Sequence, residues 1–160
     1  MVRLQLSIKA ELENITALEP AGADFEFFFQ VKCNSCHETH PKFVSLNRLE
    51  EKEVSGGKGS TAHFVWKCGL CKRESSAKFE TTAITSYSAE NGQFAPLLVI
   101  ECRGLEFIDF DPRGTWKCMG TTGTKFPEVD LVDKEWNDYD EKAAVPVGIS
   151  EFESRFERAH

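Results

Sequence analysis

The sequence predicts an all-β protein, and three observations carry that prediction. Apolar and polar residues alternate over long stretches, two Cys-x-x-Cys motifs follow directly on such stretches, and one strand-turn pattern occurs in both halves of the chain. We expect the 160 residues to form a single compact unit. Within it we predict a first β lobe over residues 1–88 and a second over residues 89–160, as two pseudo-repeated halves.

The first strand is predicted over residues 2–12. Apolar side chains stand at every second position from Val2 to Leu12, and polar ones such as Arg3, Gln5 and Lys9 stand between them. A period of two places all apolar side chains on one face of a strand, whereas a helix would scatter them around its axis. The segment therefore predicts a half-buried strand.

Further strands lead into the two Cys-x-x-Cys motifs, which we call the hooks. Phe25, Phe27, Phe29 and Val31 alternate into Cys33, and residues 62–66 alternate towards Cys68 with another apolar alternation at residues 77–79. We therefore expect each hook to lie between two strands, in the local order strand, hook, strand. The glycine-rich residues 56–60 between them predict a loop, since a phosphate-binding loop would need a following Lys-Ser/Thr pair and a helix.

The hooks place four thiols at the spacing of a zinc site. Cys33 and Cys36 form the first hook, and Cys68 and Cys71 form the second. Each hook can present two thiolates to one ion, and two hooks complete the four sulfurs of a closed structural site. We predict one structural zinc ion in the first lobe; a disulfide framework and unliganded or redox-active thiols are the alternatives.

The repeat rests on two similar segments, residues 12–22 and 105–114. With one deletion, Leu12 aligns with Leu105 and Pro20 with Pro112, and each segment follows an alternating strand. Ordinary turn chemistry after a strand could produce the same likeness. The second lobe, without metal, would depend more on its aromatic residues, which are Phe94, Phe107, Phe110, Trp116, Phe126, Trp136, Phe152 and Phe156.

Composition limits the location and the partners. The N-terminus lacks the apolar core of a signal peptide, and no stretch approaches the roughly 18 apolar residues of a membrane span. We therefore expect a protein of the cytoplasm, or also of the nucleus, that has no membrane partner. In that reducing setting cysteines favour metal over disulfides.

Residues 31–78 carry nine Lys/Arg and five Asp/Glu, although the whole chain has a net charge of −7. This local net charge of +4 fits a solvated surface or a nucleic-acid face, and the acidic total argues against nucleic acid. Residues 128–153 are acidic, and within them residues 130–142 predict a polar, turn-rich segment with two anchoring aromatics, Trp136 and Tyr139.

The other cysteines and the histidines need their own interpretation. Cys102 shares an alternating face with Leu98 and Ile100, which favours a buried small apolar residue over a ligand, whereas Cys118 is ambiguous. His37, His40 and His63 lie near the hooks, where a surface or sheet position is favoured over metal ligation.

No catalytic residue is predicted. The second hook, WKCGLCK, differs from a thioredoxin-type motif because Lys67 separates Trp66 from Cys68 and no proline lies between the cysteines. Four thiolates also fill the coordination sphere of zinc and leave no open position for a reacting water. We therefore expect a protein that is not an enzyme.

Several segments in order along the chain carry a resemblance. ENITAL, CNSC, GGKGS, CGLCKR, ECRGLEFIDFDP and WNDYDEKAAVPVGI resemble the small eukaryotic family of CXXC-motif-containing zinc-binding proteins, over nearly the full length. The resemblance implies two jelly-roll-like or barrel-like β lobes and zinc bound by Cys33, Cys36, Cys68 and Cys71. It implies no catalytic residues.

Three functional hypotheses follow. The first is a structural zinc-binding protein, expected to be a monomer, that acts as an interaction module for a protein partner. The second is a metal-handling factor that delivers zinc, and the third is a nucleic-acid-binding protein resembling a zinc ribbon.

Overall fold

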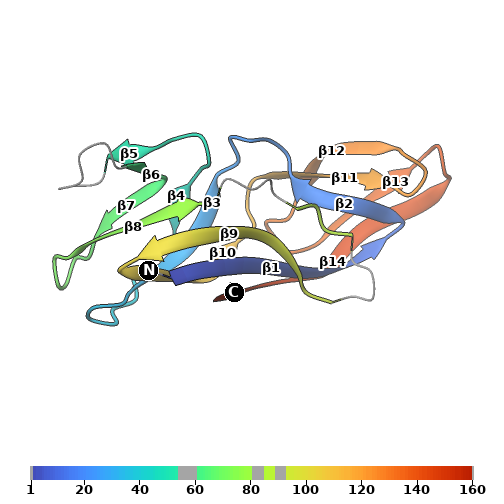
Figure 1. Ribbon diagram of the computed structural model, residues 1–160. Helices are drawn as coiled ribbons and strands as arrows, with labels where there is room; N and C mark the ends of the chain where they lie inside the picture. Colours follow the sequence, from blue (N-terminus) through green and yellow to red (C-terminus); the bar gives the residue numbers. More distant parts are fainter. Residues whose placement is uncertain (1, 54–60, 81–84, 89–92, 160) are drawn as a thin grey trace.

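The computed structural model describes residues 2–53, 61–80, 85–88 and 93–159, and within these ranges every regular element is a strand (Figure 1). The all-β class predicted from the alternation is therefore confirmed. The described residues include no helix that could cross a membrane. The strands are β1 (Val2–Glu13), β2 (Ile15–Pro20), β3 (Phe27–Cys33), β4 (Val44–Leu46), β5 (Lys52–Glu53), β6 (Thr61–Ala62), β7 (Phe64–Lys67), β8 (Glu74–Phe79), β9 (Ala95–Arg103), β10 (Leu105–Asp111), β11 (Thr115–Gly120), β12 (Lys125–Asp130), β13 (Trp136–Asp140) and β14 (Val145–Arg158).

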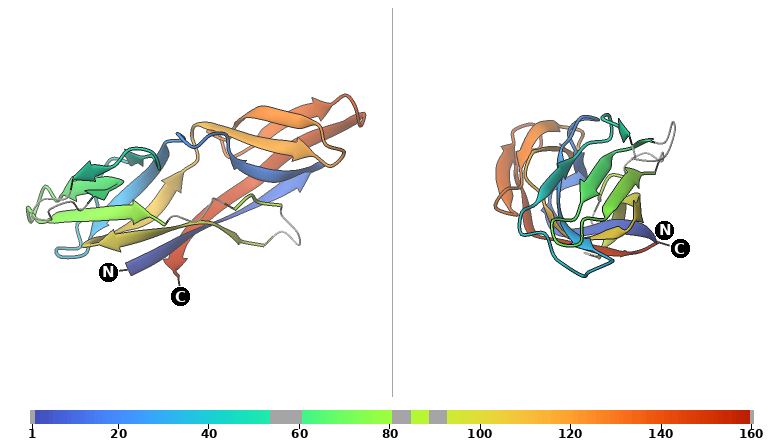
Figure 2. Two further views of the ribbon diagram at one scale, coloured as in Figure 1. Left: turned by 45° about the horizontal axis from the view of Figure 1, so that its top comes forward. Right: turned by 90° about the vertical axis from the view of Figure 1, so that its left-hand side faces the viewer.

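A six-stranded sheet with the order β13-β14-β1-β9-β8-β7 joins the two ends of the molecule. Its central strand β1 pairs antiparallel with β14 on one side and β9 on the other. The long strands β1 and β14 extend from one end of the molecule towards the other (Figure 2). Val2 and Leu12 lie within β1, so the predicted first strand is confirmed.

Two three-stranded sheets complete the two ends. The sheet β10-β3-β4 lies at the end that carries β7 and β8, and the sheet β12-β11-β2 lies at the other end (Figure 1). Each combines strands from before and after residue 88, since β3 pairs with β10 and β2 pairs with β11. The division into residues 1–88 and 89–160 thus stays a prediction about folding units, while the hydrogen-bonded sheets are shared between the two ranges.

The repeat has a structural counterpart in two strand breaks. β1 passes into β2 through Asn14, at a φ of 59°, and β9 passes into β10 through Gly104, at a φ of 82°. Each break moves the chain out of the six-stranded sheet into a three-stranded one. Asn14 and Gly104 therefore occupy equivalent places, so the sequence alignment of Leu12 with Leu105 is out of register.

One continuous core of apolar side chains fills the space between the sheets. Trp116 is fully buried, and its indole N–H donates to the Pro112 carbonyl oxygen at 2.9 Å, which satisfies its polar atom. Phe27 and Phe29 of β3 contact Phe79 and Phe107 through their rings. Five of the eight aromatics predicted to support the second half are buried, namely Phe107, Phe110, Trp116, Phe126 and Phe152, whereas Phe94, Trp136 and Phe156 are only partly buried.

The acidic segment 130–142 agrees with its prediction in part. It contains turns at residues 132–133 and 141–142, but the strand β13 lies between them. Trp136 is partly buried against Phe126, at 5.5 Å between ring centroids. Tyr139 is 51% exposed, so its predicted role as a buried anchor is wrong: it faces solvent on the edge strand of the large sheet. The glycine-rich stretch 56–60 lies outside the described residues.

Candidate metal centre

The two hooks extend from different sheets at the same end of the molecule. Cys33 is the last residue of β3, in the three-stranded sheet, and Cys36 lies in the turn that follows. Cys68 directly follows β7, in the six-stranded sheet, and Cys71 lies in the turn towards β8. The predicted order of strand, hook, strand holds for the second hook. After the first hook the chain returns beside β3 as an isolated bridge between Thr39 and Lys32 and then as the short strand β4, so the predicted order holds there as well.

Both hooks have the same backbone hydrogen bonds. The N–H of Cys33 donates to the Glu38 carbonyl at 2.9 Å, and the N–H of Cys68 donates to the Arg73 carbonyl at 3.0 Å. The carbonyl oxygen of the first cysteine in each hook also accepts a hydrogen bond from the residue just after the second cysteine. The His37 N–H donates to the Cys33 carbonyl at 2.9 Å, and the Lys72 N–H donates to the Cys68 carbonyl at 3.0 Å. Because these hydrogen bonds match, both hooks have the same backbone shape, which fixes the positions of the two sulfur atoms in each hook.

Those two donor residues have left-handed backbones. His37 has a φ of 63° and Lys72 a φ of 64°, a region that residues with a Cβ adopt at a cost of about 1–2 kcal/mol. The sequence gives little sign of this, because glycine is the usual residue at such positions. His37 therefore has a structural role, since its left-handed backbone closes the first hook. Its position beside the cysteines in the sequence did not predict this role.

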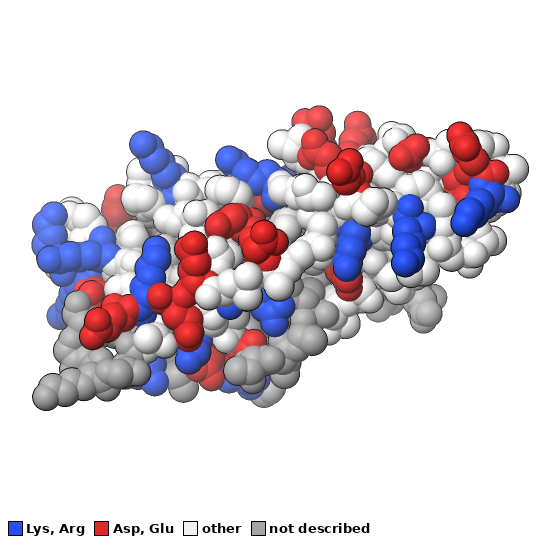
Figure 3. Space-filling view, turned by 90° about the horizontal axis from the view of Figure 1, so that it is seen from above, with Lys and Arg blue, Asp and Glu red and all other residues white. Residues whose placement is uncertain are grey.

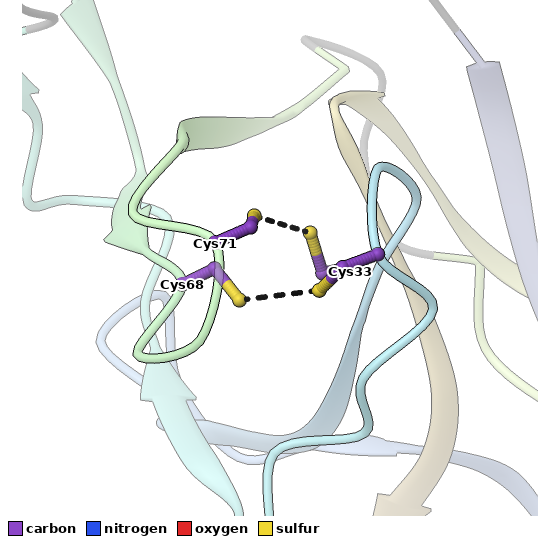
Figure 4. Close-up of side chains that lie close together, drawn as sticks. Cys33, Cys68 and Cys71 are labelled. Atoms are coloured by element: carbon purple, nitrogen blue, oxygen red, sulfur yellow. Dashed lines mark hydrogen bonds between the residues drawn. The ribbon is translucent and has the colours of Figure 1, made fainter.

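The four sulfurs converge from the two hooks (Figure 4). The Sγ atoms of Cys33 and Cys71 lie 3.6 Å apart, as do those of Cys36 and Cys68, and all four lie within 4.8 Å of one another. Zinc–sulfur bonds of about 2.3 Å at tetrahedral angles place sulfurs about 3.8 Å apart. The cluster therefore has the dimensions that a four-thiolate zinc site requires, and these four residues would hold the ion.

Backbone N–H groups favour ionised sulfur at the first cysteine of each hook. The N–H of Cys36 lowers the pKa of the Cys33 thiol to about 7, and the N–H of Cys71 likewise lowers the pKa of Cys68. At Cys36 the N–H of Glu38 acts in the same direction, but burial and the other sulfurs outweigh it and raise the pKa to about 12. Because metal ligation needs thiolates, these backbone N–H groups favour the ionised form of Cys33 and Cys68 that a metal would bind.

The remaining cysteines lie in the core, away from the four-sulfur cluster. Cys102 is 1% exposed on β9, as its alternation predicts, and Cys118 is 6% exposed on β11. Burial raises the pKa of each thiol to about 12, with Glu106 adding to it at Cys102 and Asp138 at Cys118. Both are apolar core residues in practice.

The neighbouring histidines have structural contacts. His63 Nδ1 accepts a hydrogen bond from the Phe79 N–H at 3.0 Å, and burial lowers the pKa of its imidazole, so the ring is neutral at pH 7. The His40 ring meets Trp66 edge to face at 5.9 Å between centroids. In the four-sulfur cluster itself, no histidine joins the cysteines among the described residues.

Basic side chains surround the hooks, as the sequence charge indicates. Lys72 Nζ donates to the Gly69 carbonyl at 2.8 Å, across its own hook, and Lys32 Nζ lies 4.0 Å from a Glu106 oxygen. Zinc with four thiolates has a formal charge of −2, which nearby cations stabilise. Lys67 and Arg73 are exposed beside the second hook, and Lys and Arg side chains gather at this end of the molecule in Figure 3.

One close approach fixes the position of the first hook. The Gly104 carbonyl accepts from the Asn34 N–H, inside that hook, at 3.0 Å. A Cβ at Gly104 would lie 2.7 Å from Ser75 Oγ, so the chain meets β8 there with no room for a side chain. Only contacts distant in sequence show this role, which explains why sequence patterns did not.

Comparisons with known proteins agree with this site. The family model described as CXXC motif containing zinc binding protein, eukaryotic, matches residues 5–157. A Xenopus laevis protein of that name is 43% identical over 158 residues, and a Homo sapiens one is 41% identical, each comparison covering 98% of both chains.

Two solved structures have the same fold. The crystal structure of C1orf123 superposes with a TM-score of 0.92 at 38% identity, covering 98% of this chain and 99% of the other. A hypothetical protein from Plasmodium falciparum gives a TM-score of 0.87 at 28% identity, covering 98% and 100%. With the family model matched over almost the whole chain and four cysteines at zinc-binding distances, this chain belongs to the eukaryotic CXXC motif containing zinc-binding protein family.

Proposed function

We propose that this protein is a non-catalytic, structural zinc protein whose four-cysteine site clamps two sheets together and orders a surface for a protein partner. The observation that carries the proposal is the origin of the sulfurs: one hook belongs to β3 of the three-stranded sheet, and the other belongs to β7 and β8 of the six-stranded sheet. An ion held by both hooks crosslinks the two sheets at their ends.

The local structure gives this clamp an energetic role. β7 is the edge strand of its sheet, and β4, at the edge of the other, has only three residues. Short edge strands add little stability of their own. Apparent zinc affinities in small zinc domains are worth about 10–16 kcal/mol, comparable to the whole folding free energy of a domain. Losing one hook should therefore loosen this end first.

The clamp is tested by removing one ligand. Cys68→Ser should abolish stoichiometric zinc and lower the melting temperature, whereas Cys102→Ala removes a buried thiol outside the cluster and should keep one zinc per chain. Zinc is quantified after gel filtration, beside a thermal melt. Full zinc and an unchanged melting temperature in Cys68→Ser would rule out the proposed clamp.

Closed coordination supports the non-catalytic part of the proposal. Four thiolates leave no open position on zinc, and the two further described cysteines are buried, with pKa values raised to about 12. The proposal includes a reducing compartment, the cytoplasm or the nucleus, since thiolate ligands must stay reduced there.

The second hook supports a contact surface at the zinc end. Leu70, at the tip of that hook, is 65% exposed, and the exposed cations Lys67, Lys72 and Arg73 are close to it in sequence. Because the tip is shaped by the hook, a partner that recognises it should depend on zinc. Affinity capture would compare wild type with Cys33→Ser/Cys68→Ser and with Leu70→Asn, which leaves all four cysteines in place.

The control for that capture is Val132→Asn, since Val132 is 54% exposed outside the metal end. A partner at the hook is lost in the double cysteine variant and in Leu70→Asn but retained in Val132→Asn. Equal capture by all variants would refute a metal-ordered contact surface.

Zinc delivery is the second candidate, and unequal burial of the ligands favours it. Cys33 and Cys68 are buried, but Cys36 and Cys71 are partly exposed, so a competing ligand could approach two of the four sulfurs. Loss of zinc to a chelator within minutes, without unfolding, would support delivery. Zinc released only on denaturation would support the structural role.

A further inference from the structure

A hollow lies on the three-stranded sheet β12-β11-β2, at the opposite end from the zinc site. It has a volume of about 250 Å³ and its lining is mainly apolar. Figure 3 views the molecule from the side on which this sheet lies, and shows both Lys/Arg and Asp/Glu side chains over this end, with uncharged surface between them. The lining residues are Ala17, Glu19, Lys117, Cys118, Met119, Lys125, Phe126 and Pro127.

Irregular pairing on both sides of β11 creates the hollow. Towards β12, Trp116 pairs with Val129 but Cys118 pairs with Phe126, which leaves one extra residue in β12 beside Lys117. Pro127 lies in this bulge, where its missing N–H costs no ladder hydrogen bond. The extra residue spreads β12 away from β11.

A second bulge lies on the β2 side. Lys117 pairs with Glu19 and Met119 pairs with Thr16, so β2 also has one residue too many. Ala17, within this bulge, has a φ of 56°, a strained value for a residue with a Cβ. Bulges are common at sheet edges and beside active sites, where they re-aim side chains, and strained residues cluster at functional sites.

The charges around the hollow favour an anion. Lys117 Nζ lies 3.2 Å from a Glu19 carboxylate oxygen, in a pair whose side chains are 46% and 32% exposed. Lys125 is exposed, and among the ion pairs within the described ranges none includes it. Two lysines and one glutamate leave a net charge of +1 in the lining.

The apolar part of the lining lies between the lysines. Lys117 and Met119 alternate on one face of β11, with Trp116 and Cys118 buried on the other. Met119 pairs with Lys125 across the ladder and is 38% exposed. Residues directly opposite on one sheet face are in contact range, so the thioether stands beside the Lys125 side chain.

We propose that this hollow binds a small amphipathic carboxylate. The carboxylate lies between the ammonium groups of Lys117 and Lys125, and the apolar body lies against Ala17, Met119 and Pro127. Its volume is below the roughly 300–1,000 Å³ of sites for drug-sized molecules, which restricts it to a short aliphatic or aromatic acid. The site is separate from the zinc centre and from any partner at the hooks.

Octanoate is the test ligand, followed by NMR of the Met119 and Ala17 methyl groups in the zinc-loaded protein. Saturable shifts with a Kd near or below about 1 mM are expected. Lys125→Met and Lys117→Met should each weaken binding about threefold to fivefold, the scale of one exposed charge interaction. Lys142→Met, which removes an exposed lysine outside the lining, should leave the Kd unchanged, and neutral octanol should bind more weakly than octanoate.

Two results would overturn the proposal. One is the absence of saturable shifts at these methyl groups up to about ten times that concentration. The other is an equal Kd for wild type, both lining variants and octanol, because such binding would not recognise the carboxylate. Unchanged spectra of β1 and β9 in the variants verify that the fold is intact, so neither result can arise from unfolding.

Discussion

Gly104→Ala should destabilise the protein by about 2–5 kcal/mol, because two separate costs combine at this position. Gly104 has a φ of 82°, and a residue with a Cβ in the left-handed region costs about 1–2 kcal/mol. The new Cβ would also lie 2.7 Å from Ser75 Oγ and 3.3 Å from Ser75 Cβ, an overlap that costs about 1–3 kcal/mol in a packed interior.

A double-mutant cycle separates the two costs. Ser75 Oγ is buried and has no hydrogen-bond partner in the part of the chain that the structure describes, so Ser75→Ala alone should be neutral or slightly stabilising. In the Gly104→Ala background the same change removes the 2.7 Å contact and should restore about 1 kcal/mol or more, leaving the backbone cost.

The assay is urea unfolding of all four proteins with saturating zinc, with zinc content measured beside it. Additive effects, with no recovery in the double variant, would refute the steric part of the reasoning. A stability loss below about 1 kcal/mol in Gly104→Ala would refute both parts.

Other predictions concern the hooks, a buried carboxylate and one ion pair. His37→Gly should raise stability by about 0.5–1 kcal/mol in thermal unfolding, since the exposed His37 has a φ of 63°, which glycine adopts without strain; a loss would contradict that assignment. Asp140→Ala should lower the free energy of unfolding in urea by about 2–3 kcal/mol, because Asp140 Oδ1 accepts hydrogen bonds from the Thr124 hydroxyl and from two backbone N–H groups of the next turn. Asp140→Asn keeps an acceptor oxygen and should lower it less. Equal losses in the two variants would count against the acceptor role. Arg3 lowers the pKa of Glu80, so this pair stabilises the fold above the unfolded pKa of about 4.3 and the contribution is lost as pH falls through the lowered folded value. The stability difference between wild type and Glu80→Gln should be below about 1 kcal/mol at pH 7, since Arg3 is 40% exposed, and should shrink below pH 4; a difference that grows in acid would have the wrong sign.

Local patterns in the sequence predicted much of the fold. The alternation from Val2 to Leu12 sets the central strand β1, because a period of two leaves one face apolar. The same reasoning places Cys102 in the core and Cys33 at a strand end. These features depend on neighbours in the chain, which is why one sequence suffices to predict them.

Features that depend on distant contacts were missed. Tyr139 was expected to anchor its segment because it is aromatic, yet it lies on the edge strand β13 and its side chain faces water. The left-handed backbones of His37 and Lys72 follow from hydrogen bonds that close each hook, and residue type alone would have argued for glycine. The pairing of β3 with β10 also joins residues far apart in the sequence, so no local signal shows that the two hooks come from different sheets.

Hydrogen exchange with and without zinc tests the clamp most directly. If the four cysteines hold the two sheets together, stripping zinc with a chelator should remove protection at the amides of Cys33 and Cys68 and along β7 and β8, while β11 and β12 at the other end keep theirs. Unchanged protection of β7 and β8 after complete loss of zinc would contradict the central claim that the metal site stabilises this end of the fold.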